Sequence, residues 1–205
     1  MNETEPAATR AALHAVAELL MAGPQYRRSG TIRLRVTPGG FATVAEPELR
    51  VDGTDLVTGD GTRLALAGRT IGELGAATGA GAGAPEGLYH DGSGGSADDV
   101  PAVDPGAAKV LAEALARGDA ALRVFAPEQT PVLWPEHFDL GVTVSEVNYG
   151  MSLGDGYLGE PYAYVGPWQP REGAFWNAPF GAARPLAEAG DLVAFFAEGR
   201  RLASS

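Results

Sequence analysis

The sequence predicts an α+β fold, with an antiparallel and mostly meander-like β-sheet flanked by about three main helices. Apolar residues recur at helical spacing in three stretches, one near each end of the chain and one in the middle. Residues 31–67 and 137–167 instead alternate apolar and polar side chains with the period of two that β-strands show. A length of 205 residues suits one domain, so we expect a single α+β domain over residues 1–205.

The first predicted helix spans residues 6–22. Leu13, Val16 and Leu20 recur at helical spacing and form an apolar face. The pair Gly23-Pro24 follows directly, and we expect it to end this helix.

A set of short strands follows between residues 31 and 67. Ile32, Leu34 and Val36 alternate with polar residues. This pattern predicts a half-buried strand with one solvent-exposed face. Turn signals at Pro38-Gly39-Gly40, Asp52-Gly53 and Asp60-Gly61 separate the later strands. The segment is therefore expected to form an antiparallel meander.

Three further helices are expected, two of them marked by capping residues. Thr70 and Glu73 fit a capping box before a short helix. Asp104 as N-cap and Pro105 at the first helical position begin a long helix that ends near residue 126. The last helix is expected to start after Gly190-Asp191 and to end at Gly199-Arg200-Arg201, where cations complement the helix C-terminus.

A Gly-, Ala-, Ser- and Asp-rich stretch separates the short helix from the long one. It has almost no apolar periodicity, so we expect a long, mobile loop over residues 80–103. Within it, Leu88-Tyr89-His90-Asp91 is the one cluster of larger side chains. One hypothesis is that this cluster folds over a site as a lid, with His90 and Asp91 reaching inward.

Composition restricts the classes of function. A formal net charge of −11 argues against nucleic-acid binding, which depends on neutralising phosphates. The absence of cysteine excludes disulfides and thiol nucleophiles. The N-terminal residues do not have the pattern of a signal peptide, and no apolar run approaches the length of about 18 residues typical of a membrane span. We therefore expect an acidic, cytoplasmic protein that does not bind membranes.

The segment from Leu133 to Phe180 carries the strongest signal of a functional site, because aromatic rings and carboxylates are concentrated there. We expect a strand over residues 137–144 in which His137 and Asp139 project side by side, as an acid/base pair or as two metal ligands. Two further extended pieces around Gly154-Asp155-Gly156 would bring tyrosines to the same surface. The predicted ligand-binding residues are Tyr149, Asp155, Tyr157, Glu160, Tyr162, Tyr164, Trp168 and Trp176.

A metal centre is weakly indicated. The three histidines lie apart at positions 14, 90 and 137, and no HExxH motif is present. A site of His137, Asp139 and Asp155 or Glu160 would suit Mg²⁺, Mn²⁺ or Ca²⁺ better than Zn²⁺. No residue is assigned as a metal ligand, and no cofactor is identified.

Four motifs of the C-terminal part resemble a set of uncharacterised actinobacterial hypothetical proteins. They are LWPEHFDLG at 133–141, NYGMSLGDGY at 148–157, EPYAYVGPW at 160–168 and FWNAPFGA at 175–182. The resemblance covers about the last 75 residues most closely. It implies that this block is the signature region, and it implies no activity or catalytic residue.

These observations favour a binding or interaction module for a small polar ligand at the aromatic, acidic surface within 133–180. One alternative is a hydrolase that uses His137 as a base oriented by Asp139, with or without an oxygen-ligated divalent metal. Another is a structural or oligomerisation domain whose exposed aromatic residues pack against a second copy. Aromatic residues on strands also serve as cross-strand pairs in ordinary cores, so a purely structural role stays open as well.

Overall fold

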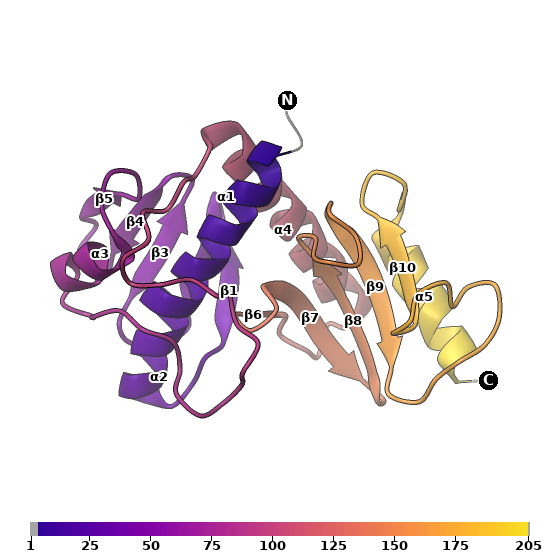
Figure 1. Ribbon diagram of the computed structural model, residues 1–205. Coiled ribbons are helices and arrows are strands. Elements are labelled where there is room, and N and C mark those ends of the chain that lie inside the picture. Colours follow the sequence, from indigo (N-terminus) through magenta and orange to yellow (C-terminus); the bar gives the residue numbers. More distant parts are fainter. Residues whose placement is uncertain (1–3, 205) are drawn as a thin grey trace. The chain divides into compact units, whose positions relative to one another are not determined.

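The computed structural model describes residues 4–204 (Figure 1). Within these residues the chain forms helices and ten strands whose pairings are antiparallel, which confirms the predicted α+β class. Its contacts divide it into two compact units. Unit 1 contains the residues up to Glu113 together with Leu133–Phe138, and unit 2 contains Ala114–Val132 and the residues from Asp139 onward. The single domain stays a prediction.

Unit 1 contains the predicted meander. Its strands run in the order β6-β1-β2-β3-β4-β5, and each of β1 to β5 pairs with the next along the chain. The turns fall where the sequence signals them, because each Gly-containing turn links two consecutive strands. The bounds are β1 Leu34–Thr37, β2 Gly40–Thr43, β3 Leu49–Asp52, β4 Asp55–Thr58, β5 Arg63–Ala65 and β6 Val132–Trp134.

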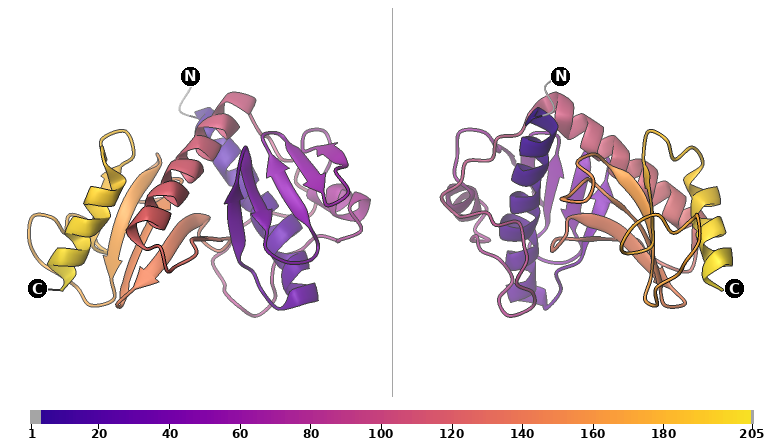
Figure 2. Two further views of the ribbon diagram at one scale, coloured as in Figure 1. Left: turned by 180° about the vertical axis from the view of Figure 1, so that it is seen from behind. Right: turned by 45° about the vertical axis from the view of Figure 1, so that its right-hand side comes forward.

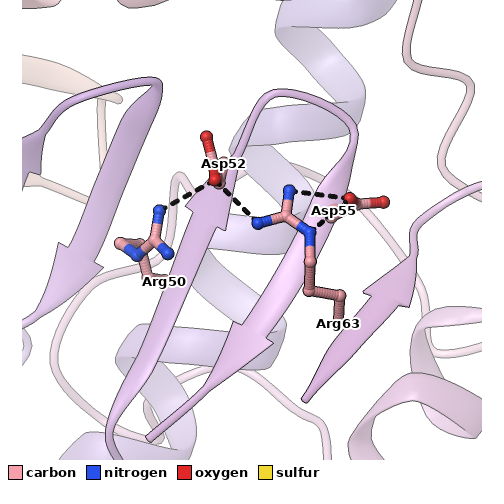
Figure 3. A network of polar contacts seen from close by, with 4 residues as sticks. All are labelled: Arg50, Asp52, Asp55 and Arg63. Carbon is pink, nitrogen blue, oxygen red and sulfur yellow. Dashed lines mark hydrogen bonds and ion pairs between the residues drawn. The ribbon is translucent and has the colours of Figure 1, made fainter. Parts of the chain in front are cut away.

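The two faces of the meander differ in polarity. Phe41, Val51 and Leu56 pair across β2, β3 and β4 and are buried, with 0–1% of their surface exposed. The outer face carries a charged network in which Asp52 bonds both Arg50 and Arg63, and Arg63 also bonds Asp55 (Figure 3). The two arginines lower the pKa of the Asp52 carboxyl, Arg63 most strongly. The side chains of these pairs are partly exposed to solvent, so we assign this network a supporting role in the strand register.

One helical region covers the buried face of the meander. It consists of α1 (Thr4–Ala15), a seven-residue π-helix η1 (Val16–Ala22) and α2 (Gly23–Ser29). The prediction that Gly23-Pro24 ends the helix is wrong, and the reason lies in the π-helical hydrogen bonds. The Gly23 amide donates to the Glu18 carbonyl, five residues back. In this pattern residue 24 would donate to Leu19, but proline has no N–H.

A neighbouring loop supplies the missing donor. The Gly83 amide donates to the Leu19 carbonyl at 2.9 Å, so this carbonyl is satisfied without residue 24. The Gly83 carbonyl in turn lies against the Cα atom of Gly23, where any β-carbon would collide with it. Gly23 therefore permits the close packing of the loop, and Pro24 fits within the helix.

The short helix α3 (Ile71–Ala77) begins with the predicted capping box between Thr70 and Glu73. Residues 80–103 contain no helix or strand, as predicted. The loop nevertheless has several anchors: the Gly72 amide donates to Ala97 at 2.7 Å, in addition to the contact of Gly83 with Leu19. Its mobility stays a prediction.

Unit 2 is built on a four-stranded antiparallel sheet in the order β10-β9-β8-β7 (Figure 2). Helix α4 begins at Pro105, where Asp104 caps it through a 2.7 Å bond to the Ala107 amide, and its second half belongs to unit 2. Helix α5 begins after the capping residue Asp191, as predicted. The bounds are α4 Pro105–Phe125, β7 Asp139–Val144, β8 Val147–Ser152, β9 Tyr162–Pro167, β10 Ala182–Pro185 and α5 Leu192–Ala203.

Helices α4 and α5 contact one face of this sheet, which we call the helix face. The ring of Tyr149 packs between Phe125 of α4 and Phe196 of α5, with centroid distances of 4.5 and 6.2 Å. Glycines allow both helices to approach closely: a β-carbon on Gly118 would lie 3.1 Å from the Met151 sulfur. Within residues 4–204, no helix is both long enough and apolar enough to cross a membrane.

Edge strand β10 has its outward backbone groups occupied. The side chain of Asn177 bonds both the amide and the carbonyl of Ala183, at 2.9 and 3.0 Å. Gly181 exchanges backbone hydrogen bonds with Ala178, and Pro185 has no amide hydrogen. Asn177 thus takes the place that a further strand would occupy.

Candidate functional site in unit 2

The face of the sheet opposite the helices carries the polar residues of the predicted site. Strand register places Asp139, Ser152 and Tyr162 in one row across β7, β8 and β9. The next row consists of Gly141, Gly150 and Tyr164. We call the face opposite the helices the open face; within it, Ser152 and Tyr162 are buried, with 4% and 3% of their surface exposed.

Tyr164 lies across the two glycines of its row. A β-carbon on Gly150 would come within 2.5 Å of the Tyr164 ring, and one on Gly141 would lie 3.0 Å from its hydroxyl. The glycines therefore let the ring pass over two strands and donate a hydrogen bond to the carboxylate of Asp139. Burial, followed by the charge of Asp139, raises the pKa of Tyr164 well above its usual value. Tyr164 is consequently a neutral hydrogen-bond donor at physiological pH.

A second tyrosine–aspartate pair lies next to the first. The Tyr162 hydroxyl donates to Oδ2 of Asp155 at 2.5 Å. The other oxygen of Asp155 accepts from the amides of Tyr157 and Leu158, at 2.8 and 3.1 Å, which fixes the loop after β8. Burial, and then the bond to Asp155, raises the pKa of Tyr162 as well. Hydrogen bonds therefore join Asp155 with Tyr162 and Asp139 with Tyr164. Tyr162 is buried, with 3% of its surface exposed, and the binding role of these residues stays a prediction.

Two partly exposed rings border these pairs. Phe180 contacts Tyr157, Tyr162 and Tyr164, with centroid distances of 5.1, 6.3 and 6.5 Å. Tyr157 is 47% exposed and Phe180 is 38% exposed, so both present aromatic surface to solvent. Phe180 is absent from the residues predicted above, because it lies in an irregular segment and only the tertiary contacts bring it to the tyrosines.

The far end of the open face carries the most exposed tryptophan. Trp168 is 60% exposed, and its indole N–H lies 3.4 Å from the amide oxygen of Asn148. The same oxygen accepts a 2.8 Å bond from the hydroxyl of Thr143. Trp168 therefore adds an aromatic surface beside two uncharged polar groups.

The remaining predicted residues lie elsewhere. Tyr149 is 1% exposed on the helix face, so its placement at a ligand surface is wrong. Its neighbours Val147 and Met151 alternate with it, and this alternation already indicated the apolar face. Trp176 is half-buried with its ring against Phe175, and Glu160 is exposed in the loop before β9.

His137 does not project from a strand. Strand β7 begins only at Asp139, and the intervening Phe138 has a φ of 52°, which interrupts the expected alternation. The expectation that His137 and Asp139 project side by side from one strand is therefore wrong. The His137 side chain is 66% exposed, and its Nε2 atom lies 3.9 Å from a carboxylate oxygen of Glu136.

Positive charge in unit 2 concentrates toward the helices. The guanidinium of Arg184 lies 4.8 Å from the centre of the Phe195 ring, and Arg171 donates to the carbonyl of Ala203 at the end of α5. Arg117 donates to the carbonyls of Leu186 and Gly190 before α5. The two bonded carboxylates described above instead belong to the open face. Among the described residues, no three His, Asp or Glu side chains gather in a group that could hold a metal ion.

Comparison of the chain with protein-family models, with curated proteins and with solved structures finds no match in any of the three. The resemblance to actinobacterial hypothetical proteins accordingly stays a prediction.

Proposed function

We propose that unit 2 binds a small polar ligand on its open face. The observation that carries this proposal is the pair of tyrosine–aspartate hydrogen bonds beside the exposed rings of Tyr157 and Phe180. Ligand sites commonly combine aromatic surface with a few fixed polar groups, and this face has both.

The chemistry of the face favours a ligand that donates hydrogen bonds. Asp139 and Asp155 offer carboxylate oxygens, which accept hydrogen bonds. The tyrosines stay protonated because their pKa values are raised, so they orient the carboxylates and do not act as bases. Hydroxyl or ammonium groups next to an apolar part would suit the carboxylates and the rings together.

The two alternatives have weaker support. A hydrolase with His137 oriented by Asp139 would need the side-by-side placement that β7 does not provide. An oligomerisation domain would use the exposed rings of Tyr157 and Trp168, but these lie beside fixed polar groups, which better suits a polar ligand. The hydrolase and the oligomer therefore stay hypotheses of second rank.

The test is a titration of the intact chain, followed by tryptophan fluorescence and isothermal calorimetry. The probes are a neutral polyol (sorbitol), a phenol with an alkylammonium group (tyramine) and its counterpart without that group (4-ethylphenol). We expect sorbitol or tyramine to bind, with affinity reduced about tenfold or more by Asp155→Asn and by Tyr157→Ala, which corresponds to about 1.4 kcal/mol. Tyr26→Phe, a change in unit 1, is the control and should have no effect.

The proposal would be contradicted if neither sorbitol nor tyramine bound the wild-type chain. Binding that is equally strong in Asp155→Asn and Tyr157→Ala would also contradict it, because the ligand would then lie away from the open face.

A further inference from the structure

The exposed aromatic rings of the described chain gather on the open face of unit 2. Tyr157, Trp168 and Phe180 are more exposed to solvent than every other Phe, Tyr or Trp among residues 4–204. We call these three residues the aromatic band. Apolar surface that stays exposed on one face of a protein is typical of an interaction site.

The aromatic band follows strand β9 from its first residue to its end. Tyr157 contacts Tyr162, the first residue of β9, with ring centroids 6.1 Å apart. The ring of Phe180 also contacts Tyr162, and its carbonyl oxygen would lie 3.5 Å from a β-carbon on Gly166. Trp168 comes directly after the last residue of β9. Gly166 thus places no side chain between Phe180 and Trp168.

The length of the band favours an elongated ligand. Strands rise about 3.3 Å per residue, so the backbone from Tyr162 to Trp168 spans about 20 Å. This distance exceeds the size of one sugar ring or one amino acid, and such a molecule would contact only one end of the band. A longer molecule can contact both ends, and linked contacts of this kind strengthen binding.

The polar groups beside the band suit a ligand that carries hydroxyl groups. Thr143 and Asn148 are exposed and uncharged, and the amide oxygen of Asn148 accepts from Thr143 and Trp168. The NH₂ group of Asn148 can therefore donate to a ligand. At the other end of the band, Asp155 is exposed and its carboxylate oxygens are acceptors. Hydroxyl groups can bond to both kinds of partner, because they donate and accept.

The distribution of charge disfavours an anionic ligand. The chain has a formal net charge of −11. Arg117, Arg171 and Arg184 contact helix α5 or the segment before it, as described above. A neutral sugar avoids this repulsion. Its ring has C–H groups on its faces and hydroxyl groups around its edge, so it can stack on an aromatic side chain and bond to neighbouring polar groups at once.

We propose that the aromatic band binds a neutral oligosaccharide of extended shape, laid along β9. One sugar ring stacks on Trp168 and another contacts Tyr157 and Phe180. Hydroxyl groups of the chain bond to Asn148 at one end and to Asp155 at the other. This inference rests on the function proposed for unit 2 and specifies the class of its ligand.

The test is isothermal calorimetry of the full chain with two neutral, extended tetrasaccharides, cellotetraose and N-acetylchitotetraose. Glucose is the one-unit control. Maltotetraose has the same composition as cellotetraose but a coiled chain, so it is the control for shape. We expect at least one extended tetrasaccharide to bind, with an affinity about tenfold or more above that of glucose, because it reaches both ends of the band. Maltotetraose should bind more weakly than cellotetraose.

Trp168→Ala separates this inference from the binding of a small ligand near Asp155. Removing an exposed platform should lower the affinity for the bound tetrasaccharide about tenfold or more. The melting temperature and the affinity for sorbitol should stay unchanged. Trp168→Phe keeps a ring and should retain most of the binding. Val124→Ala is the matched control, because Val124 is also largely exposed but lies on α4, which packs on the helix face.

Several results would overturn the inference. If sorbitol or tyramine binds but neither extended tetrasaccharide does, the oligosaccharide is wrong and the proposed function stands. If none of these four probes binds, both fail. Equal affinity of Trp168→Ala and wild type for the tetrasaccharide would place the ligand elsewhere. A wild-type dimer in light scattering that Trp168→Ala dissociates would show that a second copy covers the band instead.

Discussion

Removing the Tyr164 hydroxyl tests the bond that organises the open face of unit 2. Tyr164→Phe keeps the ring over Gly141 and Gly150 but deletes the only atom that donates to Asp139 from that side chain. A hydrogen bond to a charged group contributes about 1.5–3 kcal/mol, and this donor is buried. We therefore expect the free energy of unfolding to fall by about 1.5–3 kcal/mol. For a chain of this size, that corresponds to a melting temperature lower by about 3–12 °C.

The assay is urea denaturation of a double-mutant cycle with Asp139→Asn. The cycle isolates the pairwise interaction, so the coupling free energy between the two positions should be about 1–3 kcal/mol. Tyr157→Phe is the matched control, because its exposed hydroxyl reaches the Asn177 carbonyl only at 3.5 Å. The control should change stability by less than about 0.5 kcal/mol. A coupling free energy below about 0.5 kcal/mol would refute the assigned role of the bond. Equal losses of stability in Tyr164→Phe and in the control would refute it as well.

Two further changes probe unit 1. The pKa of His14 is lowered from 6.5 by burial, so the unfolded chain binds more protons just below that pH, and stability should fall as the pH drops from 7.5 to 5. In His14→Gln this part of the pH dependence should be absent in urea midpoints, and an unchanged dependence would count against the assignment. Gln25 is fully buried, donates to the carbonyls of Thr31 and Arg33, and accepts from two amides. Gln25→Glu loses both donors and buries a carboxylate against carbonyls, so thermal denaturation should show a loss of about 3 kcal/mol or more. The exposed Gln129→Glu should change little, and similar losses in both variants would contradict the reasoning.

Local signals predicted the element boundaries well where a capping or turn residue was present. Asp104 and the Thr70–Glu73 box both begin helices, because a side chain that binds free amides acts within a few residues. The turns of the meander follow for the same reason, since turn residues set local dihedral angles.

The errors arose where a distant contact changed a local preference. Pro24 is tolerated within a helix because the π-helical pattern and the loop amide of Gly83 remove the need for its hydrogen. The pairing of His137 with Asp139 assumed a continuous strand, but Phe138 adopts a positive φ while its ring stacks on His14, with centroids 5.3 Å apart. Neither the contact of Gly83 nor the stacking of Phe138 on His14 can be inferred from the periodicity of the sequence.

The candidate site could be predicted in part. Strand alternation placed Tyr162 and Tyr164 on one side of the same strand. In the structure their hydroxyls donate hydrogen bonds to Asp155 and Asp139, respectively. Phe180 could not be selected, because an isolated aromatic residue in a loop has no distinctive local pattern. Its role depends on which segments it contacts in the fold.

The occupied edge of β10 limits how unit 2 can recognise a partner. Many proteins bind extended peptides by letting them join a sheet as one more strand, which relies on free backbone groups. Here Asn177, Ala178 and Pro185 leave no such row along β10. The ligand proposed for this sheet would therefore contact side chains on its surface. Recognition of that kind selects for the shape and functional groups of a molecule, whereas strand addition would accept many peptide sequences.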